Sequence, residues 1–118
     1  MANQNLRSLL PASYKYHISK LYEGYYSGYP MVKADIDLLT ATLLSLETEL
    51  KQRNAASDEI VWKLDDMNHA LSGLAQWEAT GMFKGNRDAK IFVDALKQYF
   101  EDLAVMLNER DQYGESEE

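Results

Sequence analysis

The residues best suited to chemistry lie in the segment "WKLDDMNHALSG", at positions 62–73. His69 follows Asp65 by four positions and Asp66 by three, so on a helix the three side chains share one face. Imidazole and carboxylate groups at this spacing act as metal ligands in helical bundles and as partners in acid–base catalysis. The segment therefore raises two chemical functions, metal binding and proton transfer.

The inventory of the whole chain argues against both functions. Bundles that hold two metal ions take a Glu-x-x-His pair from each of two helices and a further carboxylate from each of the others. The sequence has only two histidines, and His17 has no acid at the matching offset. His69, Asp65 and Asp66 also fall opposite the apolar seam of their own helix. We predict a solvated face with local acid–histidine pairing and no metal, and we keep His69 as a candidate contact for a protein partner.

Other catalytic signatures are missing from the sequence. The 118 residues contain no cysteine, which excludes disulfides, thiol catalysis and thiolate metal sites. The segment "GMFKGNR" lacks the spacing of a phosphate-binding loop, and no G-x-S-x-G turn is present. We therefore expect a protein that is not an enzyme and needs no cofactor.

The stretch "YEGYYSGYP" holds four of the chain's eight tyrosines, namely Tyr22, Tyr25, Tyr26 and Tyr29. On a helix Tyr25 falls on the inner face, Tyr22 and Tyr29 widen that face, and Tyr26 lies at its flank. The first interpretation is packing at the end of a bundle. The second is a surface for a protein partner, because tyrosine is enriched in binding hot spots, and the third is stacking on a small ligand. All four tyrosines are kept as partner-binding candidates.

Trp62 also falls opposite the apolar seam, on the face that carries His69. A large aromatic side chain left in water is unusual unless it has a use. Two interpretations stay open. The indole packs under an N-terminal apolar strap formed by Leu6, Leu9 and Leu10, or it anchors a protein partner or a second copy of the chain.

Three segments with helical periodicity must position these side chains. Residues 31–53 and 57–79 each carry apolar positions three and four apart, which predicts a helix with one buried seam. Ser57 is suited to cap the second helix and Gly81 to end it. Residues 88–112 carry a wider apolar arc, with the main stripe predicted at Phe92, Leu96, Tyr99, Leu103 and Met106.

A fourth, shorter helix is predicted near the N-terminus, opening at Pro11. Gly24 and Gly28 would share one of its faces, which allows close approach by another backbone, and Gly28 alternatively ends the helix. Short connections join the segments. The predicted fold is all-α, an up-and-down four-helix bundle of three long helices and a shorter N-terminal one. Residues 1–112 form its single domain, and 113–118 form a disordered acidic tail.

The net charge of −7 is unevenly distributed. Residues 1–57 hold six bases and five acids, whereas residues 58–118 hold six bases and fourteen acids, so the two parts stand at +1 and −8. No basic cluster suits nucleic acid, and no apolar run is long enough for a membrane span. No secretory signal is visible at the N-terminus, and the absence of cysteine is compatible with a reducing compartment. These features predict a cytoplasmic protein that binds neither nucleic acid nor membrane.

The leading functional hypothesis is a protein–protein interaction module: an adaptor, assembly factor or regulator. The apolar residues outside the seams, Leu38, Leu44, Ile91 and Val105, further predict a homo-oligomer, expected to be a homodimer. The alternative is a small acidic inhibitor that occupies a partner's cationic or nucleic-acid-binding site.

Overall fold

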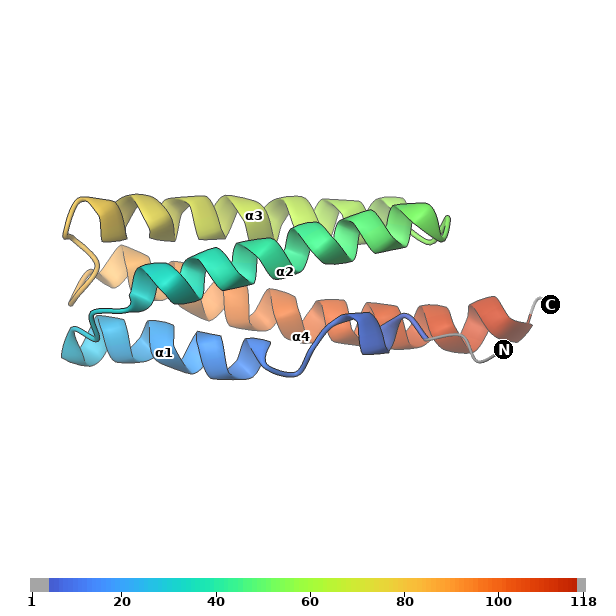
Figure 1. Cartoon of the computed structure of the whole chain (residues 1–118), viewed down its shortest axis with the longest axis horizontal. Helices are drawn as coiled ribbons and strands as arrows, with labels where there is room; N and C mark the ends of the chain where they lie inside the picture. The colour runs from blue at the N-terminus through green and yellow to red at the C-terminus, as the bar shows by residue number, and fades with distance from the viewer. Residues whose placement is uncertain (1–4, 117–118) are drawn as a thin grey trace.

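The computed structural model describes residues 5–116, and within that range the chain forms four α-helices and one turn of 3-10 helix without any strand. In chain order these are η1 (Arg7–Leu9), α1 (Tyr14–Ser27), α2 (Val32–Gln52), α3 (Asp58–Ala79) and α4 (Arg87–Ser116). The helices lie side by side in an elongated body of 51 × 24 × 19 Å (Figure 1). Each packs on its neighbours in sequence, and α1 also packs on α4. The all-α prediction is confirmed, and these contacts fit an up-and-down bundle.

The residues predicted to cap or end the helices have these positions in the structure. Ser57 caps α3, because its Oγ accepts a hydrogen bond from the Ile60 N–H at 3.3 Å. Gly28, at φ 76°, adopts the left-handed conformation that ends α1, and Gly81, at φ 72°, follows the end of α3. The predicted start of α1 at Pro11 is wrong by three residues. Pro11 opens a turn whose carbonyl accepts from the N–H of Tyr14, where α1 begins.

The seams predicted for the two central helices are confirmed. In α2 they comprise Val32, Ile36, Leu39, Leu43, Leu46 and Leu50, and in α3 Ile60, Leu64, Met67, Leu71 and Leu74, all buried. Full burial of one such side chain contributes about 1.5–3 kcal/mol, so these two rows supply much of the core's stabilisation. Among the described residues, no helix combines the length and the apolar character needed to cross a bilayer.

The buried stripe of α4 is rotated from its predicted position. Its centre runs through Val93, Leu96, Phe100, Leu103 and Leu107, whereas Phe92, Tyr99 and Met106 are only half-buried. The rotation follows from the two neighbours of α4, because α1 and α3 together cover a broad arc of its surface. Tyr14 of α1, for example, stacks on Phe100 with ring centroids 4.6 Å apart.

The C-terminal boundary also differs from the prediction. α4 continues to Ser116, past the predicted end at residue 112 and into the segment expected to be a disordered tail. Glu, Arg and Gln in residues 109–112 are good helix formers, but Gly114 in the extension is a poor one, so local propensity does not explain why the helix continues. Residues 117 and 118 of the predicted tail lie outside the described residues.

An N-terminal strap takes the place that a longer α1 would fill. α1 has 14 residues and α4 has 30, so α1 covers only part of α4. The strap of Leu6, Leu9 and Leu10 packs along the rest of α4, with Leu10 fully buried (Figure 1). Asp111 fixes it, because its carboxylate accepts the backbone N–H groups of Leu6 at 2.6 Å and Arg7 at 3.0 Å.

Candidate functional site

Trp62 stands in water on the outer side of α3. Its side chain is 63% exposed. The interpretation that it packs under the strap is wrong, because the strap lies on α4 and is held there by Asp111. The indole therefore belongs to an open surface.

Four carboxylates surround Trp62 on this surface. On a helix the neighbours of a side chain are three and four positions away in both directions. For Trp62 all four of these positions are acidic and exposed: Asp58, Glu59, Asp65 and Asp66. We call these four residues, Trp62 and His69 the α3 outer face.

Two of the carboxylates have a structural role as well. Asp58 and Glu59 lie in the first turn of α3, where the partial positive charge of the helix end favours acids. Asp65 and Asp66 are in the third turn, beyond the reach of this effect. The helix dipole therefore explains only half of the acidic charge around Trp62.

The one base close to Trp62 in sequence points elsewhere. Lys63 reaches across to α4, where its Nζ lies 3.3 Å from Oδ2 of Asp102 and 4.9 Å from the centroid of the Tyr99 ring. Hydrogen bonds from Gln98 and then from Lys63 lower the pKa of Asp102. Lys63 is thus engaged in holding α3 to α4.

His69 is exposed, as predicted, but the predicted pairing with Asp65 or Asp66 does not form among the described residues. Its ring instead lies 6.3 Å from the half-buried ring of Phe92. Phe92 also packs edge-on against Trp77, with centroids 4.9 Å apart. His69 therefore borders an aromatic contact between α3 and α4. Among the described residues, no three His, Asp or Glu side chains are grouped as metal ligands.

The tyrosine-rich segment lies on the opposite side of the molecule. α1 carries Tyr22, Tyr25 and Tyr26, and Tyr29 follows the end of that helix. α1 packs on α2 and α4, across the bundle from α3 (Figure 1). The partner-binding candidates therefore fall into two separate surfaces, and Trp62 and His69 are not joined by the tyrosines.

Three of these tyrosines are half-buried against the core, and Tyr26 is 63% exposed. The Tyr22 hydroxyl donates to Asp94 of α4. Burial and then this hydrogen bond raise the pKa of Tyr22, and the same bond lowers the pKa of Asp94. The Tyr25 carbonyl accepts from the Gly85 N–H at 3.0 Å, and Lys20 lies 5.1 Å from the ring centroid of Tyr29. Packing thus accounts for most of this segment.

The pattern of glycines near the tyrosines also has a packing explanation. A Cβ at Gly24 would overlap with Cγ2 of Val32, and Phe83 packs close by. The predicted close approach at Gly24 is real, but the approaching group is a side chain rather than a backbone. Gly28 serves as the helix end.

A buried acid–histidine pair was missed at the level of sequence. Nδ1 of His17 donates to Oδ1 of Asp35 at 2.7 Å, joining α1 to α2. Asp35 is only 4% exposed, and its Oδ2 has no hydrogen-bond partner among the described residues. One signal was available: Asp35 follows Val32 by three positions and precedes Leu39 by four, which places it at the edge of the buried seam.

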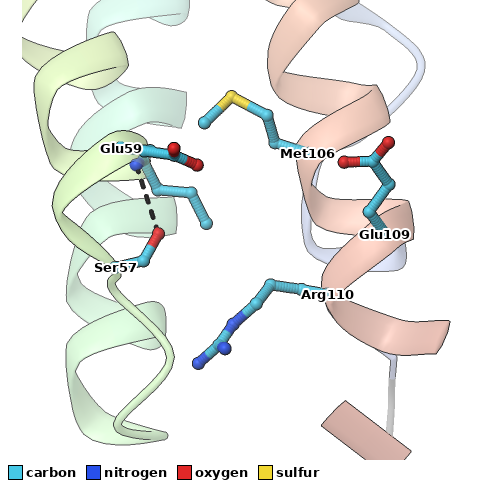
Figure 2. A pocket seen from close by; sticks show the side chains of 6 residues that line it. Ser57, Glu59, Met106, Glu109 and Arg110 are labelled. Carbon is cyan, nitrogen blue, oxygen red and sulfur yellow. Dashed lines mark hydrogen bonds between the residues drawn. The ribbon is translucent and has the colours of Figure 1, made fainter. Parts of the chain in front are cut away.

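Neither of two surface pockets lined by described residues suggests a catalytic site. Figure 2 shows one of about 140 Å³ where the start of α3 meets α4, with Arg110 reaching toward Ser57. Its walls carry mixed charge from Glu59, Glu109 and Arg110, and the Ser57 hydroxyl is already used as a helix cap. A pocket of about 290 Å³ lies between α1 and α4, over Tyr14 and Ile18.

Comparison with known proteins identified no family for this chain. A scan against protein-family models, a search of curated proteins and a search of solved structures each found no match.

Proposed function

We propose that the protein is a non-enzymatic protein–protein interaction module that acts as an adaptor, assembly factor or regulator in the cytoplasm. It binds partners through aromatic and apolar helical surfaces and uses no cofactor. The exposure of Trp62 carries this proposal. Tryptophan is enriched among residues that dominate binding energies, and a large aromatic side chain left in water favours a contact surface.

The protein also self-associates in this proposal, through the outer face of α2. That face holds a row of small exposed residues, and the exposed Leu38 and Leu44 lie toward its two sides; the small residues are Ala34, Ala41, Ser45 and Thr48. Its charged residue Asp37 is neutralised by Lys33 at 2.8 Å. Small and apolar residues on one helix face let a second helix pack closely. This face suits another copy of itself, whereas the acidic α3 outer face would repel its own copy.

Light scattering tests the self-association. We expect the mass of a dimer at concentrations of about 10 µM, in the affinity range of modest interfaces. A Leu38→Glu/Leu44→Glu variant should have the mass of a monomer with an unchanged helical spectrum, because both positions are exposed. A wild-type monomer at this concentration would contradict the proposed dimer.

A second candidate, the acidic inhibitor of a partner's cationic site, is supported by one observation. The carboxylates around Trp62 lie on a helix, not in the C-terminal acidic segment. The two candidates differ in the consequence for the partner, because an inhibitor would block the partner's own activity and an adaptor would not.

Replacing Trp62 tests the leading proposal. Affinity capture of partners from cells that produce the protein should be at least tenfold weaker with Trp62→Ala, because loss of a hot spot removes about 2 kcal/mol or more of binding free energy. Met82→Ala is the matched control, since Met82 is 60% exposed but lies in the loop between α3 and α4. Both variants should unfold at the wild-type temperature. Equal capture by Trp62→Ala and wild type would contradict the proposal.

A further inference from the structure

The four carboxylates of the α3 outer face lack the ion pairs that several other acids of the surface make. Three acids on α2 and α4 pair with a lysine one turn away, at 2.8 Å in Lys33–Asp37 and 3.1 Å in both Lys51–Glu47 and Lys90–Asp94. Among the described residues, Asp58, Glu59, Asp65 and Asp66 have no such cation. An indole whose neighbours one turn away on the helix are four carboxylates lies in a negatively charged part of the surface.

We propose that the α3 outer face binds an arginine- or lysine-containing segment of a partner protein, with one cationic side chain over the Trp62 indole. This inference rests on the proposed interaction function and specifies the chemistry of its partner. Tryptophan is the aromatic side chain that attracts cations best through its ring face. The surrounding carboxylates accept hydrogen bonds from guanidinium or ammonium groups, and guanidinium binds them in bidentate fashion.

Charge complementarity favours such a partner over a second copy of this chain. Several of the chain's own cations, including Lys20, Lys33, Lys51 and Lys90, already pair with acids on their own helices. The α3 outer face also carries four carboxylates, so two copies brought together here would repel. A neutral apolar partner would leave the four carboxylates facing an apolar surface, which is unfavourable.

The test uses a fluorescently labelled, amphipathic peptide of arginine and leucine, and its counterpart with glutamate in place of arginine. Fluorescence anisotropy with the full-length chain should give micromolar affinity for the arginine peptide, weakening as salt is raised. The glutamate peptide should bind at least tenfold more weakly. Trp62→Ala should reduce affinity for the arginine peptide about tenfold, and Asp65→Asn/Asp66→Asn should do the same.

Two matched controls separate this site from general acidity and general hydrophobicity. Glu23→Gln/Glu47→Gln also removes two charges, but from acids that already pair with Lys20 and Lys51. Met82→Ala removes an apolar side chain that is 60% exposed, close to the 63% of Trp62, and that lies in the loop between α3 and α4. Both should bind the arginine peptide with wild-type affinity.

The inference is overturned if Trp62→Ala binds the arginine peptide as the wild type does, if the charge control weakens binding as much as Asp65→Asn/Asp66→Asn, or if the arginine peptide does not bind. The proposed function is tested separately, by the capture of cellular partners. If Trp62→Ala loses those partners but the arginine peptide does not bind, the interaction module is supported and the cationic partner is ruled out.

Discussion

Replacing His17 with leucine should lower the free energy of unfolding by about 3 kcal/mol. Removing the partner of a buried carboxylate costs about 3–5 kcal/mol, because the carboxylate is left without compensation. Here the carboxylate is Asp35, whose side chain is 6% exposed and whose Oδ1 lies 2.7 Å from Nδ1 of His17. The His17 side chain is 17% exposed, so water reaches the pair and the lower end of the range applies. Thermal unfolding should show a midpoint lower by roughly 10 °C or more.

The double variant His17→Leu/Asp35→Leu is the control for this effect. Replacing both partners of a buried pair by apolar residues is often neutral or stabilising, so the double variant should recover most of the lost stability. If His17→Leu unfolds at the wild-type temperature, the hydrogen bond from His17 does not stabilise the buried carboxylate of Asp35. If the double variant is as unstable as the single one, the loss comes from packing and not from the carboxylate.

Gly24→Ala should lower the free energy of unfolding by about 1–2 kcal/mol, although alanine is the better helix former. Alanine in place of glycine gains about 1 kcal/mol in a helix interior, whereas overpacking of a core site costs about 1–3 kcal/mol. The added Cβ would overlap with Cγ2 of Val32 and lie 3.4 Å from Cε1 of Phe83. Val32 is short, branched and the first residue of α2, so the helix itself has to shift. Urea unfolding measures the difference.

Gly73→Ala is the matched control, because Gly73 is also a helical glycine close to an apolar group. Its added Cβ would lie 2.6 Å from Cε2 of Phe92. Phe92 is half-buried and presents the end of a long side chain, so its ring can move aside. Gly73→Ala should therefore stay within about 1 kcal/mol of the wild type. Equal losses at Gly24 and Gly73 would contradict the role given to Val32.

The features predictable from sequence are those that depend on neighbours along the chain. The seams of α2 and α3 follow from spacings of three and four, and the cap at Ser57 and the helix end at Gly28 follow from local backbone rules. The position of Trp62 opposite its seam follows in the same way, and its exposure agrees with it.

Features that depend on how the helices pack against one another could not be predicted from the sequence. The apolar arc of α4 is broad, so its spacing alone did not show that Val93 and Phe100 lie at the centre and Phe92 at the edge. His17 and Asp35 are 18 positions apart, and their pairing requires the docked arrangement of α1 and α2.

The candidate site also has a part that the sequence predicts and a part that it does not. The four acids around Trp62 follow from the sequence, but whether the indole is covered could not be predicted. That depended on the strap, which docks on α4 through a contact between Asp111 and Leu6, residues 105 positions apart. Whether the tyrosines pack on the core or face a partner could not be decided for the same reason, because Tyr22 hydrogen-bonds to Asp94 on a different helix.

The most direct test of the central claim follows the two tryptophan indole N–H signals by NMR while the arginine peptide is added. Trp62 and Trp77 are the chain's two tryptophans, and Trp77 is half-buried against Phe92, so it serves as an internal reference. We expect the Trp62 signal to shift in step with peptide concentration, together with backbone signals of residues 58–69, while the Trp77 signal stays in place. A stationary Trp62 signal, or shifts confined to the tyrosines of α1, would contradict the assignment of binding to the α3 outer face.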